Sequence, residues 1–140
     1  MQKVLKRKAY TITITIILTI LMSTTWIFAS SSSVSNSSYT LEGITVAYDL
    51  PENDTMGKVS IYSFTDKSVD YVRALGNVYV DGQYLDTIED VGYPSMSASA
   101  ERSILSYLWS SYAIYGYHSA QGGGNTTGHL ETTTYASWYN

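Results

Sequence analysis

The sequence predicts an all-β fold, a small antiparallel β-sandwich or barrel of about seven strands behind an N-terminal signal peptide. From Tyr39 onward, short segments alternate apolar or aromatic residues with polar ones, which is the period of a half-buried strand. Gly, Asp, Asn and Ser separate these segments, and no segment has a convincing long helical period. An Asp-Gly pair between two alternating runs marks a tight hairpin.

Residues 1–29 have the layout of a secretory signal peptide. Four Lys and Arg residues precede the apolar stretch Ala9 to Met22, and no further charge occurs before Glu42. Ala29 is a small residue at the expected cut, which we place there or a few residues into the following serines. We therefore expect a secreted, extracellular protein.

Two alternatives for this segment stay open. Residues 9–28 carry no charge over a length that spans a bilayer, so an uncleaved membrane anchor is an alternative to cleavage. Tyr10 to Ile16 alternates as a strand would. A lipid anchor on cysteine is excluded because the chain has no cysteine.

The mature chain begins with serines. Residues 30–38 contain seven serines, with only Val34 to bury, so we expect a flexible leader. Residues 39–140 then form a single domain, which is long enough to bury one core.

The elements of this domain are predicted in order. Gly43 suggests a bulge in the first strand, and residues 104–109 suggest a helical turn. The expected strands cover residues 39–48, 59–64, 69–80, a segment starting at 83, 95–102, 112–119 and 128–139.

Asp81-Gly82 is the clearest local signal. Both residue types tolerate the positive φ that a type I′ turn requires. The expected register pairs Val80 with Gln83, Tyr79 with Tyr84 and Val78 with Leu85. Tyr79 and Tyr84 then share the face opposite Val78.

Composition narrows the function classes. Residues 30–140 hold 4 bases and 12 acids, a net charge of −8, which argues against binding nucleic acid or anionic membranes. Membrane contact is expected only through an uncleaved signal peptide. The domain is acidic and tyrosine-rich, and its lack of cysteine is more typical of exported proteins of Gram-positive bacteria, where disulfide-forming machinery is sparse.

Catalytic chemistry is poorly represented. There is no cysteine, and the only histidines are His118 and His129, neither beside a nucleophile motif. If the last two strands pair, these histidines and Glu131 suggest a weak zinc site, but two ordinary surface histidines are the stronger interpretation. We predict no enzyme activity, no catalytic residues, no metal and no cofactor.

Aromatic residues crowd the C-terminal third of the chain. We predict a binding face that includes Tyr112, Tyr115, Tyr117 and Trp138, with a carbohydrate or protein as ligand. The alternative is that these rings build the core, since the chain has only 2 Phe.

The first functional prediction is a secreted, non-enzymatic β-domain that binds at the cell envelope or to an extracellular target. The second is an antibacterial effector. A β-rich, cysteine-free chain behind a signal peptide, with the tail residues Tyr115-Gly-Tyr-His118 and Trp138, is similar in outline to lactococcin-972-type bacteriocins. No specific motif matches, and the mature chain is longer than expected for a bacteriocin of this type.

Overall fold

Two stacked antiparallel sheets of four strands each form the molecule, so the predicted β-sandwich is confirmed. The computed structural model describes residues 28–49, 56–105 and 111–139. The bounds of the strands are β1 (Phe28–Ser35), β2 (Thr40–Asp49), β3 (Met56–Val69), β4 (Tyr71–Val80), β5 (Gln83–Gly92), β6 (Ser95–Leu105), β7 (Ser111–Gln121) and β8 (His129–Tyr139). Three predicted segments lie wholly or mostly outside the described residues: the expected signal peptide apart from its last two residues, the expected loop after residue 49 and most of the expected helical turn.

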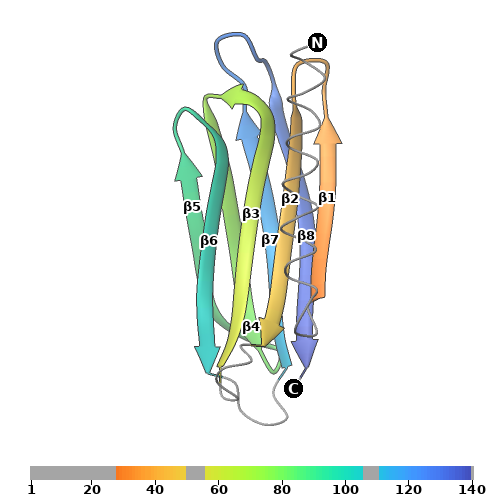
Figure 1. Cartoon of the computed structure of the whole chain (residues 1–140), viewed down its shortest axis with the longest axis vertical. Helices are drawn as coiled ribbons and strands as arrows, with labels where there is room; N and C mark the ends of the chain where they lie inside the picture. Colours follow the sequence, from red (N-terminus) through yellow and green to blue (C-terminus); the bar gives the residue numbers. More distant parts are fainter. Residues whose placement is uncertain (1–27, 50–55, 106–110, 140) are drawn as a thin grey trace.

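The strand orders are β1-β2-β3-β6 in the first sheet and β5-β4-β7-β8 in the second. All strands run along the long axis of the molecule (Figure 1). Because the two sheets are stacked, each has one face against the other sheet and one outer face. No helix occurs in the three described ranges, and therefore none there is long enough to cross a membrane.

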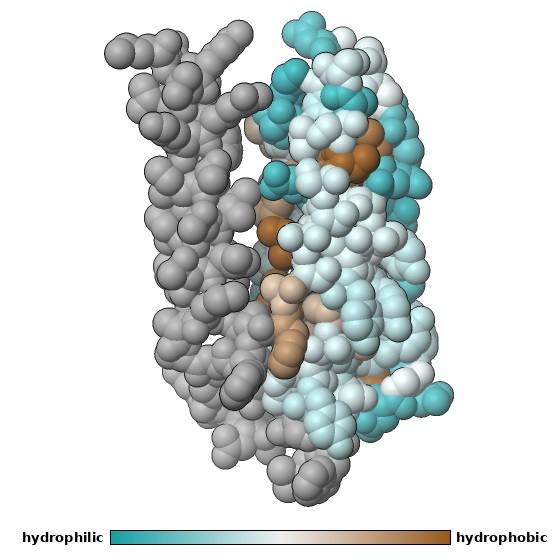
Figure 2. All heavy atoms as spheres, turned by 90° about the vertical axis from the view of Figure 1, so that its right-hand side faces the viewer, coloured by the Kyte–Doolittle hydropathy of each residue, from teal (hydrophilic) through white to brown (hydrophobic). Residues whose placement is uncertain are grey.

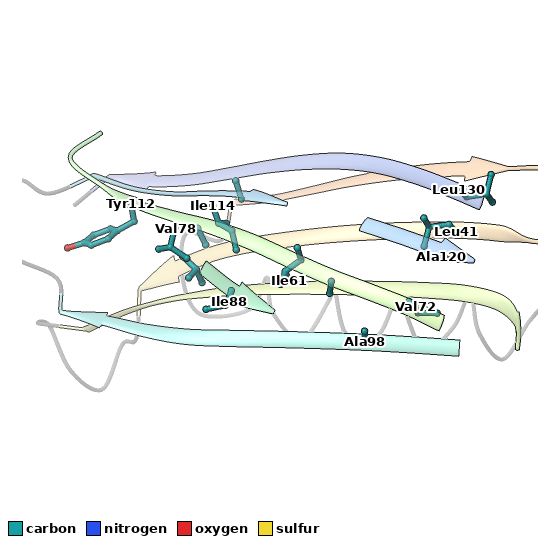
Figure 3. Close-up of a cluster of buried hydrophobic side chains, with 14 of the residues drawn as sticks. Leu41, Ile61, Val72, Val78, Ile88, Ala98, Tyr112, Ile114, Ala120 and Leu130 are labelled. Atoms are coloured by element: carbon teal, nitrogen blue, oxygen red, sulfur yellow. The ribbon is translucent and has the colours of Figure 1, made fainter. Parts of the chain in front are cut away.

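Alternating side chains from both sheets fill the space between them. Leu41 and Ile61 from the first sheet meet Val72, Val78 and Ile114 from the second, and all five are fully buried. Figure 3 follows this cluster from Tyr112 near one end of the sandwich to Leu130 near the other. The two-residue period of the sequence thus sets which side chains face the core.

The serine segment differs from the expected flexible leader. Phe28–Ser35 forms edge strand β1, paired antiparallel with β2 in continuous register. Val34 packs against the core, and the Ser32 and Thr132 hydroxyls form a 2.6 Å hydrogen bond between β1 and β8. Backbone pairing to a neighbouring strand orders these serines, and serine composition alone does not reveal that partner.

The Asp81-Gly82 turn is confirmed, with φ of 50° and 76°. Val80 faces Gln83 and Tyr79 faces Tyr84 as predicted. The third expected pair is wrong, because a bulge places Asp86 opposite Val78. The extra residue in β5 turns Ile88 toward the core, where it is buried, and leaves Leu85 exposed.

Gly43 does not form the expected bulge, since its pairing on both sides is in register. Its role is close packing between the sheets. A Cβ built on Gly43 would lie 2.2 Å from Cδ2 of His118, so only glycine leaves room for that ring.

Loops at one end of the sandwich are tied together by hydrogen bonds. The single proton of the buried Tyr39 hydroxyl is shared between two carbonyl oxygens, that of Ala120 at 2.8 Å and that of Gly128 at 2.9 Å. Asn36 Nδ2 donates to the carbonyl of Thr127 at 2.9 Å. The connection between β7 and β8 is therefore held against the turn between β1 and β2.

Candidate binding face

Exposed tyrosines collect on the outer face of the β5-β4-β7-β8 sheet. We call this set the tyrosine face. Its members are Tyr79, Tyr84, Tyr115, Tyr117 and Tyr135, and they come from all four strands of the sheet. Four of them expose 45–58% of their surface, and Tyr79 is half-buried among them.

The ring contacts follow from strand register. Tyr79 faces Tyr84 across the hairpin, with ring centroids 5.8 Å apart. Tyr79 also meets Tyr115 edge-on at 5.3 Å, and Tyr115 lies opposite Tyr135 with centroids 4.7 Å apart. These contacts make a continuous row of four rings across the sheet, in the edge-on and tilted geometries that aromatic pairs favour.

A shallow hollow of about 430 Å³ opens beside this row. Its lining includes the small residues Gly82, Ser111 and Ala113. The other lining residues are the tyrosines Tyr79, Tyr115, Tyr117 and Tyr135. Its volume falls in the range that small-ligand sites occupy, and the part of its lining that the structure describes contains no ionisable acid or base other than tyrosine.

A second hollow of about 240 Å³ continues along the same face. Its lining mixes the polar residues Arg73, Ser119 and Glu131 with the apolar Leu75, and Tyr117 belongs to both hollows. Arg73 Nε lies 2.5 Å from Glu89 Oε1, which fixes the guanidinium on this face.

The four predicted binding residues separate into two pairs. Tyr115 and Tyr117 lie on the outer face, where 45% and 48% of their surfaces are exposed. Tyr112 and Trp138 point the other way and are buried, with their rings stacked 5.5 Å apart. The expectation that all four share one exposed face is therefore wrong in position for Tyr112 and Trp138.

The period of β7 explains the difference. Tyr112 has the same parity as Ile114 and faces the core, whereas Tyr115 and Tyr117 have the opposite parity. The sequence prediction did not include Tyr79, Tyr84 and Tyr135. The hairpin had already placed Tyr79 and Tyr84 together, but only the pairing of β4 with β7 brings them beside Tyr115.

The suggested histidine pair does not assemble. His118 points into the core and is 1% exposed, whereas His129 is exposed with Nε2 at 2.8 Å from Glu131 Oε1. Within the described ranges, no three His, Asp or Glu side chains are grouped as metal ligands.

His118 instead joins the two sheets through hydroxyl groups. Ser63 donates its hydroxyl proton to the carbonyl of Arg73 at 2.8 Å, so its oxygen accepts from Nδ1 of His118 at 2.9 Å. Nε2 then accepts from the Thr134 hydroxyl at 2.7 Å. Burial lowers the pKa of His118 to about 4, and this effect exceeds the opposing hydrogen bond to the Tyr62 backbone.

This network lacks what a catalytic triad needs. Ser63 and His118 are both buried, so a substrate has no access to the hydroxyl. Both ring nitrogens meet hydroxyls, so no carboxylate orients the imidazole as a triad requires. The network is a polar link inside the core.

Figure 2 faces the β1 and β8 side of the molecule. The described surface there is mostly pale to teal, with small separate hydrophobic patches. Comparison with protein-family models, with curated proteins and with solved structures finds no match.

Proposed function

We propose that the protein is an exported, non-enzymatic binding domain whose ligand surface is the tyrosine face. Export is inferred from the basic and apolar start of the sequence. Binding is inferred from the exposed tyrosines and the hollow between them. The target is the cell envelope or another extracellular surface.

The observation that carries the proposal is the row of four tyrosines beside a concave, neutral hollow. Single exposed apolar residues are ordinary on protein surfaces, but a contiguous aromatic set beside a hollow is typical of recognition surfaces. Tyrosine supplies a large, stiff contact area and a polar tip at low entropic cost. Because neighbouring rings restrict each other's movement, the side chains lose little conformational entropy on binding.

Co-sedimentation with intact Gram-positive cells and their purified envelopes tests the proposal. The protein, expressed from its full chain, is compared with a Y115T/Y135T variant, because threonine keeps strand preference while removing both rings. We expect the bound fraction to fall at least tenfold.

Tyr93→Thr is the matched control. Tyr93 is 72% exposed and lies in the turn between β5 and β6, at the opposite end of the sheet from Gly82. It should bind as the unaltered protein does. Equal binding by Y115T/Y135T, or no binding by the unaltered protein, would contradict the proposal, and growth inhibition independent of the tyrosines would favour the antibacterial alternative.

A further inference from the structure

We infer that the ligand of the tyrosine face is a neutral, linear glycan that lies along β7 and occupies both hollows. This inference rests on the proposed function, because it assigns a ligand class to the same face. We base the inference on three features of the two hollows that share Tyr117: their combined length, their charge and the hydrogen-bonding groups in their lining.

Length is the first argument. The lining residues on β7 run from Ser111 in the larger hollow to Ser119 in the smaller one. At about 3.3 Å per residue this distance is roughly 26 Å, which suits an extended chain of several sugar units. Tyr117 belongs to both hollows, so one chain can contact it from either side.

Charge is the second argument. Among the described residues, the lining of the larger hollow contains no carboxylate, lysine or arginine, and the neighbouring Asp81 already accepts a 2.7 Å hydrogen bond from the Ser111 backbone N–H. The net charge of −8 over residues 30–140 disfavours an anionic polymer. A neutral ligand with flat apolar patches and many hydroxyls fits rings whose edges carry hydroxyl groups.

Hydrogen bonding separates a glycan from its main competitor, a proline-rich peptide. Aromatic grooves also bind such peptides, whose proline residues have no backbone N–H. The smaller hollow presents both kinds of hydrogen-bonding group: the Arg73 guanidinium donates, the Glu131 carboxylate accepts, and the hydroxyls of Ser119 and Thr133 do either. Sugar hydroxyls both donate and accept, so they can pair with Arg73 and with the lone pairs of Glu131 that its contact with His129 leaves, whereas a proline-rich segment supplies acceptors but few donors.

Isothermal titration calorimetry provides the test. Protein expressed from the full chain is titrated with cellohexaose, chitohexaose, maltohexaose, laminarihexaose and mannohexaose, and with decaproline as the competing probe. We expect micromolar to millimolar binding of at least one hexasaccharide, and none of decaproline.

Two variants locate the ligand. Tyr117→Thr should weaken hexasaccharide binding at least tenfold because the ring lies in both hollows, and Glu131→Gln should weaken it severalfold by replacing an acceptor oxygen with a donor. Tyr93→Thr should leave the affinity unchanged, and thermal melting checks that all three variants are folded.

The outcomes are distinguishable. Binding of decaproline alone, or of no probe while tyrosine-dependent envelope binding persists, would overturn the glycan assignment and leave the proposed function standing. Hexasaccharide binding that is unaffected by Tyr117→Thr would also overturn it. Envelope binding that does not depend on the tyrosines would overturn the proposed function itself.

Discussion

His118 shows how one residue type can be misinterpreted from sequence. A histidine beside exposed tyrosines resembles a ligand, yet its parity on β7 turns it into the core. Gly43 on one sheet and Gly116 on the other leave the space that its ring needs. The histidine and the two glycines therefore pack as one unit. The sequence does not show this, because the glycines come from different sheets.

The buried ring makes stability depend on pH. The folded state keeps His118 neutral down to about pH 4, whereas the unfolded chain binds the proton below its usual pKa of 6.5. This contribution is fully present above pH 6.5 and is lost as the pH falls toward 4, amounting to about 3 kcal/mol. Urea unfolding between pH 7 and 4 should show this slope.

His118→Gln should remove the slope, and His129→Gln should keep it. If the His118→Gln variant does not fold, the pKa of the His118 ring is measured by NMR in the unaltered protein. A His118 ring that titrates near pH 6.5 would contradict the prediction that its burial makes stability depend on pH.

Two buried threonines provide a matched pair. The Thr45 hydroxyl has no hydrogen-bond partner in the described structure, whereas the Thr134 hydroxyl donates to His118. Thr45→Val removes an unpaired polar group and should raise the free energy of unfolding by about 1 kcal/mol. Thr134→Val leaves Nε2 without its donor and should lower it by about 1–3 kcal/mol.

Chemical denaturation of the two variants measures the difference. Because both changes convert a buried threonine to valine, their opposite signs would isolate the hydrogen bond. Equal destabilisation by the two changes would show that packing, and not pairing, dominates at both positions.

At the scale of elements, the hairpin between β4 and β5 depends on backbone conformation. Gly82 has φ of +76°, and a Cβ there would meet no atom within 4 Å. Gly82→Ala should therefore cost only the strain of a left-handed residue, about 1 kcal/mol. Gly57→Ala is the control, since its Cβ makes only an ordinary 3.7 Å contact, and it should not destabilise the protein.

Thermal unfolding compares these two variants. A Gly82→Ala protein as stable as the unaltered one would mean that the turn conformation is not needed at this position.

The strands were largely predictable because alternation and turn chemistry are local signals. Segments at 59–64, 69–80, 95–102, 112–119 and 128–139 all lie within or across observed strands. β1 was not predictable, since its order comes from pairing with β2 and not from its serines. The bulge opposite Val78 was missed because the burial of Ile88, which favours it, depends on the opposing sheet.

The candidate site was predictable only in part, for the same reason. Tyr115 and Tyr117 were recognisable within one strand, and stricter use of the two-residue period would have set Tyr112 apart. Tyr84, Tyr79, Tyr115 and Tyr135 form a row only when four strands lie in the observed order, which requires tertiary structure.

At the scale of the whole molecule, export predicts a defined N-terminus. Intact-mass spectrometry of the culture supernatant should find a chain that starts at Ser30 or at a nearby serine. A cut after Ala29 removes only two β1 residues, Phe28 and Ala29, and keeps Val34 on the core. A membrane-bound chain that retains Met1 would instead show an anchored protein.

NMR of the tyrosine rings shows whether the tyrosine face is the ligand surface. Protein labelled with ¹³C in its tyrosine rings is titrated with soluble fragments released from Gram-positive envelopes, and single Tyr→Phe variants assign the signals. We expect shifts at Tyr79, Tyr115, Tyr117 and Tyr135, with the signals of the buried Tyr39 and the distant Tyr93 unchanged. Shifts confined to Tyr93 or to Tyr62 on the opposite sheet, or no shift at all, would contradict it.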